Sequence, residues 1–194
     1  MIADGFYDVP PGKIATIVTY LERRDPPSEP FEARDDVSIT RVHPSPERYL
    51  ETFRRIGGPY LWASRLLISS DALSTILASP DVEMYELQRD GALAGVLELD
   101  YRVPDACEIV YFGVIREAQG RGFGNHLMRF ALHRAWHRPI ERVWLHTCTL
   151  DDPIAIQFYR RNGFVPYKRQ FDIFDDPRVI GMLPADIAPG VPLL

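Results

Sequence analysis

A segment with three glycines, Gln119-Gly120-Arg121-Gly122-Phe123-Gly124-Asn125, separates a strand-like apolar run from a helix-like run. Glycine adopts backbone angles that are closed to other residues and lets backbone N–H groups approach a ligand. At a helix start the first N–H groups lack intrahelical acceptors, and the positive end of the helix dipole lies there. The segment therefore predicts a strand–turn–helix unit with an anion site suited to a phosphate or pyrophosphate.

Two other phosphate-binding loops do not fit this segment. A P-loop needs the triplet Gly-Lys-Ser/Thr, which the chain lacks. The dinucleotide fingerprint G-x-G-x-x-G would need a third glycine at position 125, which is asparagine. A tight glycine turn that binds no ligand is the alternative interpretation.

Hydrophobic periodicity and turn residues predict an α+β domain with a mostly antiparallel central sheet and flanking helices. Ser45-Pro46 begins a helix that Gly57-Gly58-Pro59 ends, and Asp90-Gly91 suits a type I′ hairpin turn. The segment Tyr60–Leu67 is ambiguous. The expected strands are 12–21, 37–42, 82–89, 92–102, 107–115, 142–149 and 165–174, and the other expected helices are 71–78 capped by Ser70, 122–136 and 153–161.

Length, charge and cysteine content narrow the class of protein. The 194 residues suit one catalytic domain (37–194) preceded by a strand extension and linker (1–36). A net charge of −5 argues against a nucleic-acid partner, and no apolar run is long enough for a membrane span. Two cysteines, Cys107 and Cys148, and no signal-like N-terminus indicate a soluble cytoplasmic protein in which both thiols are buried.

The glycine segment is interpreted together with the residues that follow it. Gln119-x-x-Gly122-x-Gly124, a following strand, and then Phe158-Tyr159-x-x-Asn162-Gly163-Phe164 resemble the GCN5-related N-acetyltransferase (GNAT) family. The order of elements from Val37 to Phe174 also fits that family. The resemblance implies the GNAT acyl-CoA N-acyltransferase fold, with acetyl-CoA as cosubstrate and without a metal. It also implies a splayed strand pair that holds the coenzyme.

The resemblance implies where the coenzyme lies. Backbone amides of the 119–125 turn hold its pyrophosphate, and the strand residues Phe112, Gly113, Val114 and Ile115 pair with its pantetheine arm. The contacting turn residues are Gln119, Gly120, Arg121, Gly122, Phe123, Gly124 and Asn125. Asp152 stands where the family often has asparagine and lacks an amide donor, although its oxygen suits a helix start.

Two residues are candidates for proton transfer. Glu108 lies in an apolar run eleven residues before Gln119, a spacing similar to that of the catalytic glutamate in histone-acetyltransferase-like members. It is interpreted as the base for the amine, against a structural carboxylate that faces solvent or an arginine. Tyr159 is interpreted as the acid for the leaving thiolate, against a core aromatic.

The acceptor side is less defined. The segment with Tyr60 and Trp62 and the last strand with Asp172 would line the acceptor site. The alternatives are core packing for the two aromatic side chains and an exposed acidic loop for Asp172. His126, His133 and His137 share a helix spacing that favours a solvated face over a zinc site.

The sequence thus predicts transfer of an acetyl group from acetyl-CoA to a primary amine by direct attack. The acceptor is a small molecule, a protein lysine or an N-terminus. The alternative is a non-catalytic coenzyme-A-binding sensor or interaction module. Many relatives form homodimers, so a homodimer is a further expectation.

Overall fold

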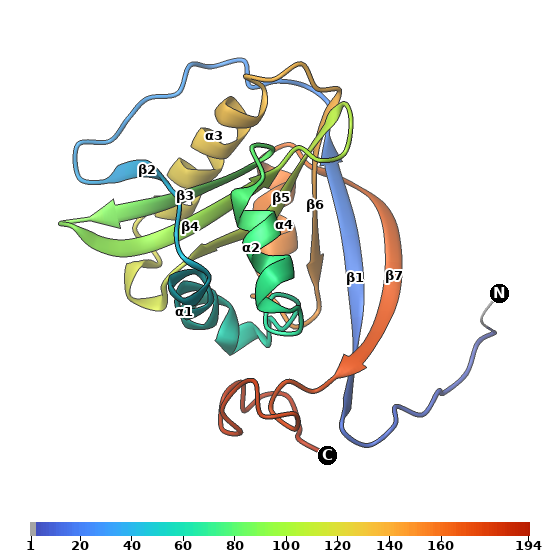
Figure 1. Ribbon diagram of the computed structural model, residues 1–194. Helices are drawn as coiled ribbons and strands as arrows, with labels where there is room; N and C mark the ends of the chain where they lie inside the picture. The colour runs from blue at the N-terminus through green and yellow to red at the C-terminus, as the bar shows by residue number, and fades with distance from the viewer. Residues whose placement is uncertain (1–2) are drawn as a thin grey trace.

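Seven strands form one sheet in the computed structural model, which describes residues 3–194 (Figure 1). They are β1 (Lys13–Arg23), β2 (Ser38–Val42), β3 (Val82–Arg89), β4 (Ala92–Asp100), β5 (Ala106–Val114), β6 (Arg142–Cys148) and β7 (Val165–Asp175). Their order across the sheet is β2-β3-β4-β5-β6-β1-β7. Only β5 and β6 run parallel, so the predicted mostly antiparallel α+β architecture is confirmed.

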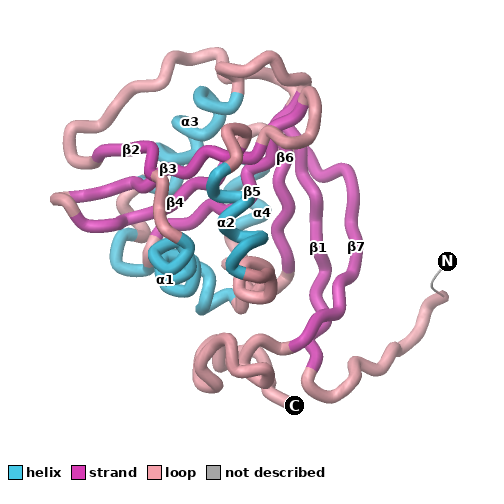
Figure 2. The backbone as a smooth tube through the Cα atoms, in the orientation of Figure 1, coloured by secondary structure: helices cyan, strands magenta, loops and turns pink. Residues whose placement is uncertain are grey.

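Helices cover both faces of the sheet (Figures 1 and 2). The pair α1 (Pro46–Gly57) and α2 (Ser70–Ala78) lies on one face, and α3 (Phe123–Ala135) and α4 (Ala155–Arg161) lie on the other. Two short 3₁₀ turns, Gly58–Tyr60 and Arg116–Ala118, complete the elements. Each face has its own apolar core: Phe53 and Leu73 belong to the first, and Leu127 and Phe164 to the second.

Most local predictions are confirmed. The Ser45 side chain accepts a hydrogen bond from the Arg48 N–H at the start of α1, and Asp90 and Gly91 both have positive φ, as a type I′ turn requires. Two helix starts were predicted wrongly. Ser69, not Ser70, caps α2. The other, α4, begins at Ala155 instead of Pro153 because the Asp152 side chain first forms a turn with the Ile154 N–H.

The strand β1 lies inside the sheet, between β6 and β7 (Figure 1). Val18 sits opposite Cys148 on one side and opposite Gln170 on the other. The sequence predicted a strand here but placed it in an N-terminal extension outside the catalytic domain. Because β1 hydrogen-bonds to two later strands, it is part of the sheet that forms the site.

The segment 24–37 crosses over α3 on its way from β1 to β2 (Figure 2). The ring of Phe31 lies 5.0 Å from His126 and 5.6 Å from Phe130. His126 is therefore buried, and the prediction that it lies on a solvated helix face is wrong. His137 follows the end of α3 and is exposed.

The C-terminal segment after β7 is held by a buried ion pair. Arg178 Nη2 lies 2.7 Å from Asp176 Oδ2, and both side chains are almost fully buried. The same guanidinium donates from Nη1 to the carbonyl of Val191 at 2.9 Å. This pair folds the segment back so that Leu183 joins the core beside Leu61.

Candidate active site

The strands β5 and β6 separate at the centre of the sheet. They pair only where Ala106–Glu108 faces Arg142–Trp144. A cavity of about 780 Å³ opens beyond that point, with walls from β5, β6, α3, α4 and the segment 60–67. A bulge shapes its edge, since Tyr111 faces Glu98 and Ile109 faces Leu99, which leaves Val110 without a partner on β4.

Most residues that the sequence assigned to the site line this one cavity. They are Tyr60, Trp62, Phe112, Gly113, Val114, Gln119, Gly120, Gly122, Phe123, Gly124, Asp152, Tyr159 and Asp172. Four assigned residues are outside the set of lining residues: Glu108, Ile115, Arg121 and Asn125. Of these, Ile115 is buried in the apolar core.

The glycine-rich turn presents the start of α3 to the cavity. Gly120 and Gly122 have φ of 74° and 78°, angles that suit glycine. The first helical hydrogen bond runs from the His126 N–H to the Gly122 carbonyl, at 3.1 Å. The N–H groups of residues 123–125 precede it, so they are donors that a bound anion can accept from.

An arginine from outside the predicted pattern braces this turn. Arg34, on the segment that crosses α3, donates from Nη1 to the Arg121 carbonyl at 3.2 Å, and its guanidinium lies 5.0 Å from the centre of the Phe123 ring. Its own charge is paired with Asp36 at 2.8 Å. The turn is thus fixed by a segment far away in the sequence.

Tyr159 lies in the cavity wall among aromatic side chains. Its ring centre is 5.5 Å from that of Phe158 and 6.4 Å from that of Phe112. Burial, with a smaller contribution from the Asp151 carboxylate, raises the pKa of Tyr159 above its ordinary value. Its phenol therefore keeps its proton at neutral pH and could donate it to a leaving group.

The sequence reasoning missed Asp151, the carboxylate that fixes one side of the cavity. Its Oδ1 accepts from Trp62 Nε1 at 3.0 Å, and its Oδ2 accepts from Thr147 Oγ1 at 2.7 Å and from the Cys148 N–H at 2.8 Å. Asp151 therefore ties the segment that carries Trp62 to the end of β6. The pair Asp151-Asp152 after a strand was the only signal in the sequence.

Tyr60 and Asp152 are brought together at the same end of the cavity. The Tyr60 hydroxyl lies 3.5 Å from Asp152 Oδ2, and the Asp152 Oδ1 accepts from the Ile154 N–H at 3.1 Å. Cys148 also lines the cavity and is half-buried, so the prediction that both thiols are fully buried holds for Cys107 only.

Glu108 contacts a histidine that the sequence did not single out. His146 Nδ1 lies 3.5 Å from Glu108 Oε1, and the imidazole lines the cavity. The ring of Tyr20, on β1, lies 5.6 Å from that of His146. Glu108 itself is largely buried and faces this histidine, not an arginine. The two groups form a carboxylate–imidazole pair beside the separation of β5 and β6.

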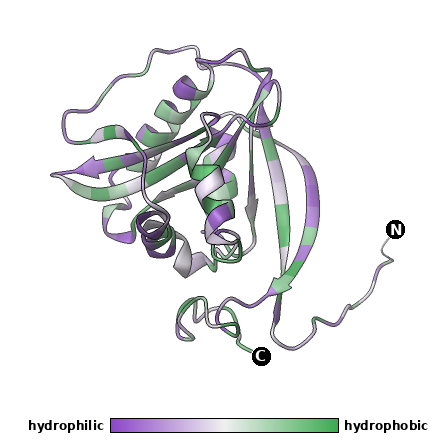
Figure 3. Cartoon of the chain, in the orientation of Figure 1, coloured by the Kyte–Doolittle hydropathy of each residue, from purple (hydrophilic) through white to green (hydrophobic). Residues whose placement is uncertain are grey.

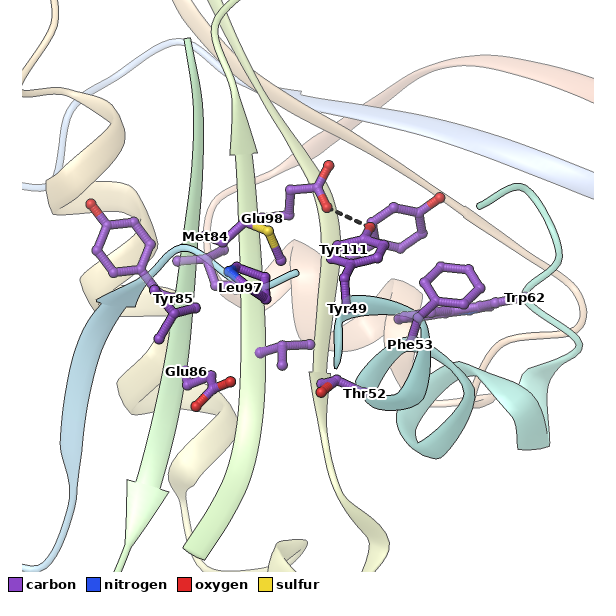
Figure 4. Close-up of a pocket in the computed structure, with 13 residues that line it drawn as sticks. Tyr49, Thr52, Phe53, Trp62, Met84, Tyr85, Glu86, Leu97, Glu98 and Tyr111 are labelled. Carbon is purple, nitrogen blue, oxygen red and sulfur yellow. Dashed lines mark hydrogen bonds between the residues drawn. The ribbon is translucent and has the colours of Figure 1, made fainter. Parts of the chain in front are cut away.

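A buried ion pair supports the aromatic part of the wall. Figure 4 shows a smaller pocket that shares Trp62 and Tyr111 with the cavity and that contains Glu98, one partner of this pair. Arg65 Nη2 lies 2.6 Å from Glu98 Oε1, and the Tyr49 hydroxyl donates to Glu98 Oε2 at 2.7 Å. Burial and the Glu98 carboxylate raise the pKa of Tyr49. Tyr111 lies over the Arg65 guanidinium and beside Trp62, so this network sets the position of both rings.

The charged side chains of the cavity wall are mostly acidic. Asp151, Asp152 and Asp172 line the cavity, and no lysine or arginine from the described part of the chain does. Such a wall attracts a cation by long-range electrostatics. Within residues 3–194, no cluster of three or more potential metal ligands occurs. No helix in the same range is both long and apolar enough to cross a membrane.

The model of the acetyltransferase (GNAT) family matches residues 45–164. An N-acetyltransferase from Lactobacillus delbrueckii subsp. lactis, described as uncharacterized and in the pepI 3′ region, is 28% identical over 145 residues. The match covers 69% of this chain and 82% of that protein.

Solved structures share the fold at low identity. A functionally unknown conserved protein from Staphylococcus epidermidis matches with a TM-score of 0.62 and 18% identity. The match covers 85% of this chain, which spans only 63% of that protein's length. An aminoglycoside acetyltransferase from an uncultured soil metagenomic sample, in complex with sisomicin, matches with a TM-score of 0.53 and 16% identity, covering 66% of this chain and 87% of that one. These likenesses confirm the predicted GNAT fold.

Proposed function

The chain belongs to the acetyltransferase (GNAT) family, and on this premise we propose that it transfers an acetyl group from acetyl-CoA to a primary amine. One observation carries the proposal. A single cavity joins the glycine-rich turn before α3, which suits a phosphate, to an acidic wall that suits a cationic amine. Its volume of about 780 Å³ lies within the range of small-molecule and cofactor sites.

The coenzyme side of the cavity offers backbone groups for most of the molecule. The N–H groups of residues 123–125 would hold the pyrophosphate, since Gly120 and Gly122 keep side chains out of its path. The pantetheine arm would lie along Phe112–Val114, where β5 has lost its pairing with β6. Asp152 would border this arm as an acceptor of hydrogen bonds only.

In the proposed reaction the amine nitrogen attacks the thioester carbonyl carbon directly. The C–N bond forms, the C–S bond breaks, and the sulfur leaves with the bonding electrons. Tyr159 would donate its proton to that sulfur, because its buried phenol is protonated at neutral pH. The amine nitrogen loses its extra proton to the Glu108–His146 pair, with the imidazole facing the cavity.

The acceptor would enter past Tyr60, Trp62 and Asp172. Rings that carry a polar tip provide an apolar wall with a few hydrogen-bonding groups, and Asp172 is exposed and available for a cation. Small amines, protein lysines and N-termini all meet this description. An aminoglycoside belongs in the set to be tested, since a structure of similar fold binds sisomicin.

The test is release of free coenzyme A thiol from acetyl-CoA in the presence of amines. A panel of monoamines, polyamines, aminoglycosides and lysine peptides should contain acceptors that raise release above the hydrolysis rate, with matching acetylated product by mass spectrometry. Calorimetry of coenzyme binding runs in parallel. Binding without turnover on the full panel would favour the coenzyme-binding sensor, and no binding would overturn the proposal.

A further inference from the structure

The chain contains only two lysines, Lys13 and Lys168, although lysines and arginines together number 22. Arginine stays charged and offers no primary amine, so amine side chains are rare in this protein. The two lysines also differ in their contacts. The Nζ of Lys13 lies 2.6 Å from Asp175 Oδ1, whereas the Nζ of Lys168 lies over the ring of Tyr20, 4.7 Å from its centre. Lys13 is thus held by an ion pair, and Lys168 by an aromatic ring.

Lys168 lies on the face of the sheet that forms the cavity wall. Hydrophilic and hydrophobic colours alternate along β7 in Figure 3, and residues an even number of positions apart on a strand share a face. Asp172 and Phe174 line the cavity, and Lys168 shares their face. Lys13 is opposite Asp175 in the register, so it lies on the other face. Only one of the two lysines is therefore on the side of the site.

Tyr20 connects Lys168 with the carboxylate–imidazole pair. In the sheet, Tyr20 is opposite Lys168 of β7 on one side and opposite His146 of β6 on the other. Its ring centre lies 5.6 Å from that of His146, which lines the cavity and contacts Glu108. The lysine amine, the phenol ring and the imidazole thus form a row across β7, β1 and β6 that ends in the cavity (Figure 1).

The amine of Lys168 can move along this row. A lysine carries its charge on a flexible four-carbon stem, and Lys168 is exposed. A cation–π contact at an exposed site is weak. The amine can therefore leave the ring of Tyr20 and turn toward the imidazole of His146.

We propose that Lys168 is acetylated by the chain's own activity, with the acetyl-CoA bound in the same chain as donor. This inference rests on the proposed function. The Lys168 Nζ would attack the thioester carbonyl carbon, so that a C–N bond forms and the C–S bond breaks. The ammonium loses two protons in all. One replaces the proton that Tyr159 donates to the sulfur, and the other leaves to solvent through His146.

The modification would change the charge near the acceptor entrance. Acetylation removes the positive charge of a lysine and its cation–π contact, here the one with Tyr20. Lys168 shares its sheet face with Asp172, and its charge opposes the approach of a cationic acceptor to that carboxylate. The acetylated chain would therefore present a more acidic entrance.

Labelling in the absence of any added amine tests the proposal. The native chain is incubated with acetyl-CoA that carries a deuterated acetyl group, and mass spectrometry follows the peptides that contain each lysine. Lys168 should be labelled at least tenfold faster than Lys13, at a rate per chain that does not depend on protein concentration. Equal labelling of the two lysines would indicate chemical acetylation, and a rate that rises with concentration would indicate transfer between chains. Either result would overturn the proposal.

Variants identify the acceptor and the route. Lys13→Arg is the matched control, since it keeps a cation beside Asp175 and should leave the label at Lys168 unchanged. Lys168→Arg should abolish the fast label. His146→Gln should slow labelling of Lys168 at least tenfold and leave the slow labelling of Lys13 as it is. Circular dichroism checks that each variant is folded. Labelling of Lys168 that is insensitive to His146→Gln would contradict the proposed route.

The panel of added amines separates this proposal from the proposed function. If added amines are acetylated while Lys168 is labelled no faster than Lys13, only the assignment of Lys168 is overturned. If neither the amines nor Lys168 are acetylated and the coenzyme does not bind, the proposed function is overturned as well.

Discussion

His146 Nδ1 lies 3.5 Å from Glu108 Oε1, and of the two side chains only the imidazole lines the cavity. In the proposed function, Glu108 would therefore reach an acceptor amine through His146. In the proposed reaction this carboxylate would orient the imidazole, and the imidazole would take up the proton of the amine. The two residues would therefore have different roles, and substitution of each would change the pH dependence of the rate to a different extent.

The first prediction concerns this pair. His146→Gln should lower the acetylation rate most near neutral pH, where an amine such as lysine, with an ordinary pKa of about 10.4, is almost fully protonated. The deficit should shrink as rising pH deprotonates the amine without help. Glu108→Gln should give a smaller deficit of the same pH dependence. The measurement is a pH–rate profile with one acceptor.

Non-additivity provides the check on this prediction. If Glu108 acts through His146 as proposed, the double variant should be no slower than His146→Gln alone. His43→Gln, an exposed histidine outside the site, should leave the profile unchanged. Profiles that run parallel for native and variant enzymes across the pH range would rule out this pair as the base.

The second prediction concerns the glycine turn. Gly124 can carry a small side chain, since a Cβ there would meet the Phe158 ring at an ordinary 3.7 Å. Gly124→Asp should lower coenzyme A affinity at least tenfold, about 1.4 kcal/mol, because it adds a negative charge where the proposed function places a phosphate. Gly124→Asn is the matched neutral control and should lose less. Equal coenzyme A affinities of the two variants in calorimetry would show that the pyrophosphate does not bind at this turn.

The third prediction concerns Tyr159. Tyr159→Phe keeps the ring among Phe112 and Phe158 and removes only the hydroxyl, so the fold should survive. The maximal rate should fall by one to three orders of magnitude, in line with general-acid contributions of about 10²–10⁴, at unchanged coenzyme affinity. Since burial raises the pKa of the phenol, native activity should not decline through loss of this proton near pH 10. A full rate in Tyr159→Phe would make the tyrosine a packing residue.

The fourth prediction concerns the ion pair that anchors the C-terminal segment. Arg178→Met should lower the free energy of unfolding by about 3–5 kcal/mol, because it leaves a buried carboxylate unpaired. Arg55→Met, at an exposed site on α1, should change it by less than about 0.5 kcal/mol. Urea titrations of the three proteins provide the comparison. A loss below 1 kcal/mol for Arg178→Met would contradict an anchoring role.

The same pair gives a pH dependence of stability. The hydrogen bond from Arg178 lowers the pKa of Asp176 in the folded state below its ordinary 3.8. A lowered carboxyl pKa contributes stability above the unfolded value, and that contribution is lost as pH falls through the folded one. The stability difference between the native chain and Arg178→Met should therefore narrow on acidification below about pH 4. A constant difference would contradict this linkage.

The extent of sequence-based prediction follows from how local each signal is. Ser45, the Asp90-Gly91 turn and the glycines at 120 and 122 act within a few residues, and the structure places all of them as expected. The strands that pair with β1 could not be predicted from local signals. The β-branched residues within 12–21 indicate a strand, but nothing in them specifies that β6 and β7 will flank that strand.

The site shows the same division. Residues on the turn and on the following elements were found from one motif, and most of them line the cavity. His146 and Asp151 were missed because their importance comes from contacts across the sheet, with Glu108 on β5 and with Trp62 after α1. The segment 24–37 read as a linker, since its contact with the glycine turn depends on a single arginine, Arg34.

The position of β1 has a consequence for how the chain acquires its structure during synthesis. The hydroxyls of Thr16 and Thr149 lie 2.7 Å apart although 133 positions separate them, and Lys13 meets Asp175 across 162. Such long-range pairing slows folding. During synthesis, β1 has no strand to pair with until β6 and β7 have emerged from the ribosome. Until then, Thr16 and Val18 cannot form their part of the cavity wall. A nascent chain released or arrested before Asp175 therefore lacks one side of its cavity, so the wall is complete only after nearly the entire length described here has been translated.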